Sequence, residues 1–120
     1  RKDGDFDRAI ASYSEAIREP ADDSQLFNAL YWRAESYAEQ NRFSDAYTDY
    51  AAAKQVACFI TDEVSYGRRY SAKMIPSEFC RKWADEKMER VAAGLSESQI
   101  EEAKRKAGDL LPSKYQKPLE

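Results

Sequence analysis

The side chains that could do chemistry are few, and their types exclude the commonest catalytic sites. The 120-residue chain has no histidine, the usual general base and metal ligand, and only two cysteines, Cys58 and Cys80. Two thiolates are too few for a structural zinc site, and a cysteine nucleophile would lack its usual basic partner. No glycine-rich phosphate loop is present. The sequence therefore predicts no enzyme, no metal site and no cofactor.

The two cysteines lie beside aromatic residues, Cys58 next to Phe59 and Cys80 next to Phe79. Two states fit this setting, a pair of buried free thiols or a mutual disulfide. We predict free, buried thiols. A disulfide would instead indicate an oxidising compartment.

The charged residues are typical of solvated helix faces. The carboxylates with this spacing include Asp22-Asp23, Asp45, Asp49 and Glu101-Glu102. Arg68-Arg69, with Tyr66 and Tyr70, would make either an anion-binding patch or a polar helix face with packed tyrosines, and we favour the second. The net charge is −3 and the basic residues are dispersed, which argues against nucleic-acid binding. No run of 18 apolar residues predicts a membrane span.

The elements that position these side chains are predicted to be helices. Glycine and proline number four each, and alanine and long straight side chains dominate. A motif recurs at a spacing of 37 residues, GDFDRAIASYSEAI and NRFSDAYTDYAAAK. Its equivalent pairs are Phe6 and Phe43, Ala9 and Ala46, Tyr13 and Tyr50, and Ala16 and Ala53. The steps of three and four residues follow one helix face, and the alanines allow close helix crossings.

Between the two copies, a helix is predicted over SQLFNALYWRAESYAEQ, with Asp23 or Ser24 as its N-cap and Asn41-Arg42 as the following turn. The sequence predicts a loop or a frayed helix end over residues 58–67, and a short helix over 68–75. Pro76 then breaks the chain. A helix from Glu78 to about Ala93 follows. The last helix, from about Glu97 to Leu110, starts at a capping box over residues 96–99. No sheet is predicted.

With these helices and this repeated motif, the chain resembles the tetratricopeptide repeat family. The matching residues are Gly4, Phe6, Ala9, Ala16 and Pro20 in the first copy, and Leu30, Ala34, Tyr37, Phe43, Ala46 and Ala53 in the second. The resemblance implies an all-α fold of antiparallel helix pairs in a short right-handed α-solenoid. Residues 1–57 would hold the repeats, the first lacking its first helix, and residues 58–120 an irregular helical continuation ending in a cap.

The segment MERVAAGLSESQIEEAKRKAGDL also resembles the closing helices of bacterial Sel-one-like repeat proteins. The match rests on Leu95, Ser96, Gln99, Ile100, Glu102 and Ala103. This resemblance implies a bacterial source and a terminal helix that caps the stack with a polar outer face. The chain would be cytoplasmic, or periplasmic if a signal peptide precedes it.

The tetratricopeptide resemblance also implies a binding groove on the first helix of each repeat. It selects Asn28, Tyr31, Trp32, Glu35 and Glu39 as partner-binding residues. The core face would instead take Leu30, Ala34 and Tyr37. Co-chaperone members of the family grip a terminal carboxylate with an asparagine at the position of Trp32, so that mode is disfavoured here. An acidic, aromatic groove predicts a peptide with basic and apolar residues.

Two functions follow as hypotheses. The chain is either a protein–protein interaction module with a partner in the groove, or a structural end cap whose N-terminal helix face stacks on further repeats or on a second copy. The partner's identity is open in both.

Overall fold

The computed structural model describes residues 3–57, 63–65, 74–112 and 115. Five helices make up most of this part of the chain, as the all-α prediction requires. Their bounds are α1 Asp3–Arg18, α2 Asp23–Glu39, α3 Phe43–Ala57, α4 Ser77–Ala92 and α5 Glu97–Leu110. None of the helices in the described ranges is long and apolar enough to cross a membrane.

The helix ends follow the polar residues beside them. The Asp22 side chain accepts a hydrogen bond from the Gln25 amide and caps α2, one residue earlier than predicted. The predicted capping box of α5 is confirmed, because Ser96 and Gln99 each accept from the other's backbone amide. The turn between α2 and α3 is also confirmed. There Asn41 adopts a left-handed φ of 62°, which asparagine tolerates better than most residues.

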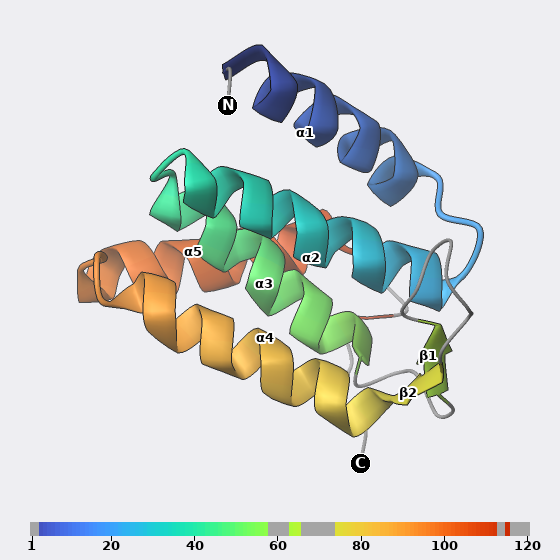
Figure 1. Cartoon of the computed structure of the whole chain (residues 1–120). Coiled ribbons are helices and arrows are strands. Elements are labelled where there is room, and N and C mark those ends of the chain that lie inside the picture. Colours follow the sequence, from blue (N-terminus) through green and yellow to red (C-terminus); the bar gives the residue numbers. More distant parts are fainter. Residues whose placement is uncertain (1–2, 58–62, 66–73, 113–114, 116–120) are drawn as a thin grey trace.

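Consecutive helices run in alternating directions, and α3 lies in the middle of the structure (Figure 1). It packs against α2, α4 and α5, whereas α1 packs chiefly against α2 among the described elements. The helices α4 and α5 both pack on α3 rather than chiefly on each other. A single hydrophobic core joins the two predicted segments, since it contains Leu30 and Tyr50 together with Val91, Ala103 and Tyr115.

The small residues of the repeat motif have unequal surroundings. Ala46 and Ala53 of α3 are fully buried, as expected for close helix crossings. Ala9 and Ala16, at the equivalent positions of α1, are only half-buried. The prediction of a close crossing is therefore confirmed for Ala46, whereas for Ala9, which is half-buried, it stays a prediction.

One local prediction is wrong. The chain contains a two-stranded antiparallel hairpin, in which β1 (Glu63–Ser65) pairs with β2 (Met74–Pro76) through the register Val64 to Ile75. Each strand is three residues long, too short to show an alternating apolar pattern. The end of the helix predicted at 68–75 therefore lies in a strand. Residues 66–73, with the proposed anion patch, lie outside the described residues, as do Cys58 and the side chain of Cys80.

Candidate partner-binding surface

The outward face of α2 carries most of the predicted partner-binding residues. Asn28, Trp32, Glu35 and Glu39 follow one another at steps of four, three and four residues, so they form one stripe along the helix. We call these four residues the α2 stripe. Its borders are set by polar contacts, because Arg33 of α2 bonds to Ser14 of α1 and Glu35 bonds to Lys87 of α4. Within the stripe, Trp32 and Glu39 are exposed, whereas Asn28 and Glu35 are half-buried.

Trp32 is the most exposed large hydrophobic side chain of the described residues. It is 37% exposed, whereas the core residues around it on α2 are nearly inaccessible. The ring of Tyr31 meets the Trp32 ring edge to face, with centroids 5.2 Å apart and an interplanar angle of 88°. Because neighbouring aromatic rings prefer this arrangement, Tyr31 supports Trp32 in its outward position.

Tyr31 itself is not part of the exposed surface, and the prediction that it lines the groove is wrong. It is 9% exposed and packs against Phe27 and Tyr50. The cause is the wide buried face of α2, which is covered by α1 on one side and by α3 on the other. A helix covered twice buries more of its circumference than the single stripe expected from the repeat rhythm. Tyr37, predicted as core, is only half-buried.

Glu35 is the best-positioned carboxylate of the α2 stripe. Its Oε2 accepts a hydrogen bond of 3.0 Å from the hydroxyl of Tyr50, a residue almost wholly inside the core. The same oxygen lies 3.0 Å from Nζ of Lys87 on α4. Burial raises the pKa of Tyr50 above its usual range, and the Glu35 carboxylate raises it further. The stripe is therefore tied to both α3 and α4 at this residue.

The remaining residues of the stripe, Asn28 and Glu39, differ in their exposure to solvent. Glu39 is exposed near the end of α2, where it extends the acidic side of the surface. Asn28 is half-buried and makes a polar or ring contact of its own. The acidic groove predicted from the sequence is thus partly neutralised, because Lys87 reaches it from a helix distant in sequence.

A buried ion pair, which the sequence reasoning missed, holds the three N-terminal helices together. Asp49 of α3 is 1% exposed and receives two hydrogen bonds from Arg33, of 2.6 Å and 2.8 Å. A third nitrogen of Arg33 donates to Ser14 Oγ of α1 at 2.8 Å. The prediction of a solvated face is wrong for Asp49, which lies three residues after Ala46 and four before Ala53, on the same helix face as both. That spacing was the available signal.

The pKa values of this pair follow from its surroundings. Burial raises the pKa of Asp49, and the charge and hydrogen bonds of Arg33 oppose that rise. Burial also disfavours the charged form of Arg33, but its hydrogen bond and charge interaction with Asp49 outweigh the effect, so its pKa is raised. Arg33 and Asp49 satisfy each other's charge and hydrogen-bonding groups, so neither side chain is available for acid–base chemistry.

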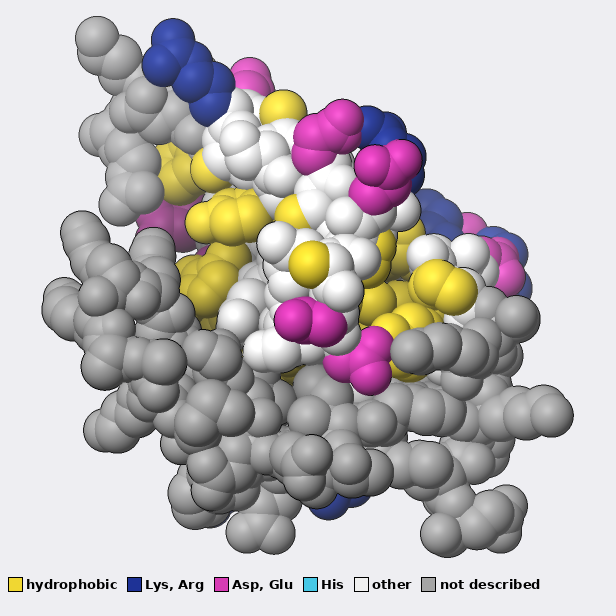
Figure 2. All heavy atoms as spheres, turned by 90° about the vertical axis from the view of Figure 1, so that its right-hand side faces the viewer, with side chains coloured by type: hydrophobic (Ala, Val, Ile, Leu, Met, Phe, Trp, Pro, Cys, Tyr) yellow, Lys and Arg dark blue, Asp and Glu magenta, His cyan; other side chains and the backbone are white. Residues whose placement is uncertain are grey.

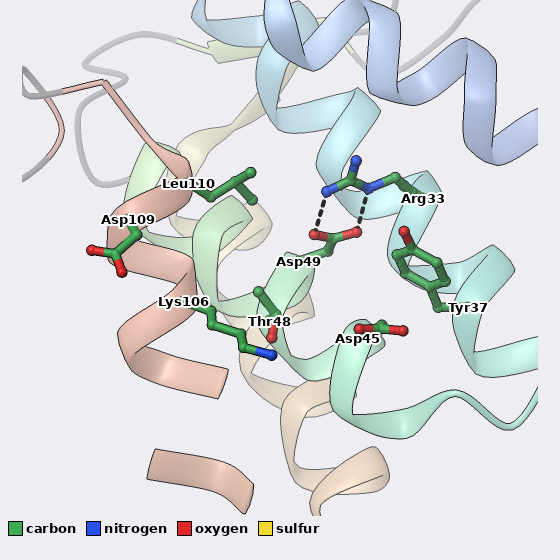
Figure 3. A pocket seen from close by; sticks show the side chains of 8 residues that line it. All are labelled: Arg33, Tyr37, Asp45, Thr48, Asp49, Lys106, Asp109 and Leu110. Atoms are coloured by element: carbon green, nitrogen blue, oxygen red, sulfur yellow. Dashed lines mark hydrogen bonds and ion pairs between the residues drawn. The ribbon is translucent and has the colours of Figure 1, made fainter. Parts of the chain in front are cut away.

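A hollow of about 280 Å³ opens beside this pair, between α2, α3 and α5 (Figure 3). Arg33 and Asp49 lie at its inner side, Lys106 reaches across from α5 towards Thr48, and Asp109 points away from the pair. Its rim carboxylates have cationic neighbours, Arg42 for Asp45 and Arg105 for Asp109. The opposing charges largely cancel, so the hollow favours no ionic ligand class. Within the described residues, no cluster of three or more potential ligands could hold a metal ion.

The described part of the end at which α1 leads into α2 carries acidic, basic and hydrophobic side chains (Figure 2). On the described part of this face, acidic side chains stand beside patches of hydrophobic ones (Figure 2). Asp22 is used here as the cap of α2, and Asp23 accepts a hydrogen bond from the hydroxyl of the buried Tyr115. These carboxylates therefore have structural roles.

Comparisons with protein-family models, with curated proteins and with solved structures found no match to this chain. The assignment of a function therefore depends on the surface of the molecule itself.

Proposed function

We propose that this chain is a protein–protein interaction module that holds a peptide or protein partner on the α2 stripe, with Trp32 as the anchor. The observation that carries the proposal is the exposure of Trp32 beside Glu35 and Glu39 on an otherwise closely packed helix. Exposed tryptophans are frequent hot spots in interfaces, because they remove a large apolar area from water with few rotors to immobilise. The proposal assigns no catalytic step to the chain.

The proposed architecture is a tetratricopeptide-like, right-handed α-solenoid closed by α5. Three features support it. The helices alternate in direction, the motif of α1 recurs in α3, and α5 buries Ala103 and Ala107 while its other face is polar and exposed. The Sel-one-like resemblance of residues 88–110 is part of the same proposal.

A second candidate function is a structural end cap or oligomerisation segment, and it depends on α1. The large apolar side chains of α1, namely Phe6, Ile10, Tyr13 and Ile17, are only half-buried. In this alternative, a second copy or a neighbouring repeat covers α1. Light scattering separates the two functions, because the alternative expects a concentration-dependent dimer that is weakened by Tyr13→Glu and unaffected by Trp32→Ala.

The direct test of the proposed function uses the partner recovered from the native source with full-length protein. Truncating Trp32→Ala should weaken the binding of that partner by about 2 kcal/mol, roughly thirtyfold in affinity. Glu89→Ala is the control, because Glu89 is exposed and, two residues after Lys87, points to the opposite side of α4. Both variants should keep the parent's melting temperature. A Trp32→Ala variant that binds the partner normally would refute the proposal.

A further inference from the structure

The ion pair between Glu35 of α2 and Lys87 of α4 lies beside Trp32. Its geometry favours replacement of Lys87 by another cation. Glu35 is held from inside by the hydroxyl of Tyr50, which belongs to the buried core and has little freedom to move. Lys87 reaches the same carboxylate oxygen from outside, and its side chain is 30% exposed. Lysine carries its charge on a flexible four-carbon stem, so the ammonium group can swing into solvent while the carboxylate stays in place.

The two carboxylate oxygens of Glu35 differ in their contacts. Both interactions use Oε2, and Oε1 has no hydrogen-bond partner within the described part of the chain. One turn further along α2, Glu39 is exposed and makes no ion pair with any described residue. The α2 stripe thus offers a fixed carboxylate and a second, free one, beside an exposed indole ring. Carboxylates next to an aromatic face suit a guanidinium group, which stacks on the ring and forks its hydrogen bonds to the carboxylates.

We propose that Glu35 is the cation-binding group of the α2 stripe and that Lys87 is its internal ligand, which an arginine side chain of the partner displaces. This inference rests on the proposed function and adds to it the chemistry of the partner. Lys87 then determines specificity. It pairs with the Glu35 carboxylate when no partner is bound, so a basic segment binds only if its affinity is high enough to displace Lys87. The nearby Arg90 of α4 is exposed and also acts on Tyr50 through its charge, so it contributes to the same threshold.

The test uses two fluorescein-labelled peptides built from leucine, proline and arginine, with glutamate in place of each arginine in the second. Lys87→Met should bind the arginine peptide about twofold to fivefold more tightly than the parent, the range expected from losing a partly exposed competing ion pair. Lys54→Met is the matched control. Lys54 of α3 pairs with Asp85 of α4 at 2.7 Å and is similarly exposed, so its loss changes the net charge equally at a different ion pair.

A second arm isolates the carboxylate. Glu35→Gln keeps an oxygen that can accept from Tyr50, so the fold should survive, and melting temperatures check this. In the Glu35→Gln background, the gain from Lys87→Met should vanish. The inference is overturned if Lys54→Met gives the same gain, if the gain persists without Glu35, if the glutamate peptide binds as well as the arginine peptide, or if no variant binds the arginine peptide.

Failure of the inference and failure of the proposed function give different results. Binding that depends on Trp32 but does not respond to Lys87→Met contradicts the inference alone. A recovered partner whose binding ignores Trp32→Ala contradicts the proposed function, whatever the peptides do.

Discussion

The same sequence motif forms two helices, α1 and α3, that differ in how completely their motif residues are buried. In α3 the motif residues Ala46, Tyr50 and Ala53 are almost inaccessible to solvent, whereas their counterparts Ala9, Tyr13 and Ala16 in α1 are half-buried. The difference comes from neighbours, since α3 is covered by α2, α4 and α5, and α1 chiefly by α2 among the described elements. A motif therefore specifies which face of a helix can be buried, and the surrounding chain decides how completely it is.

The largest expected difference in stability is between variants of Asp49 and of Ser12, the equivalent residue 37 positions earlier. Replacing Asp49→Ala leaves the half-buried Arg33 without its carboxylate, and removing one partner of a buried ion pair costs about 3–5 kcal/mol of folding free energy. Ser12 is exposed, so Ser12→Ala should change stability by less than about 0.5 kcal/mol. Urea denaturation measures both. Equal effects at the two positions would remove the proposed distinction between the helices.

The next effect compares the two alanines at the helix crossings. Ala46→Leu should destabilise the chain by about 1–3 kcal/mol, because the added side chain overpacks a fully closed site. Ala9→Leu should cost much less, since the same position in α1 is only half-buried. The melting temperatures of the two variants give the comparison, and a larger loss for Ala9→Leu would show that α1 is covered in solution.

A smaller effect concerns the contact that α1 has and α3 lacks. Ser14 accepts a hydrogen bond from Arg33, whereas the equivalent residue of α3 is Ala51. Ser14→Ala should cost about 1 kcal/mol, and the loss should appear mainly as faster exchange of the α1 amides with solvent. Uniform acceleration across α1, α2 and α3 would indicate that Ser14 stabilises the whole fold and does not act as a local anchor.

The smallest effect is a pH dependence. Burial and Glu35 raise the pKa of Tyr50 above its ordinary value of 10.0. A phenol with a raised folded-state pKa keeps its proton in the folded chain after it has lost it in the unfolded chain. Its contribution is therefore complete below pH 10 and declines as the pH rises above that value. Tyr50→Phe should make the stability fall less steeply above pH 10 in denaturant titrations. An unchanged slope would contradict the buried setting of Tyr50.

Much of the helical structure could be predicted from local residues alone. The start of α5 follows from the Ser96 capping box, and the turn before α3 follows from Asn41, because both signals act within a few residues. The burial of Ala46 also follows from the motif. The three-residue strands of the hairpin were too short to leave a periodic signal.

The candidate site was predictable only in part. Trp32, Glu35 and Glu39 do share an outward stripe, but Tyr31 is buried, because α1 and α3 together cover more of α2 than one face. The Arg33–Asp49 pair and the Lys87 contact join residues far apart in the chain. Their partners are set by how the helices pack, which no local spacing encodes.

The most direct measurement follows the fluorescence of Trp32. The chain has two tryptophans, so Trp83→Phe leaves Trp32 as the only emitter. In the free protein, acrylamide should quench that emission readily, because the Trp32 side chain is exposed. In the complex with the recovered partner, quenching should fall several-fold as the ring becomes covered. Equal quenching in the free and bound protein would contradict the account, because it would show that the partner binds without touching Trp32.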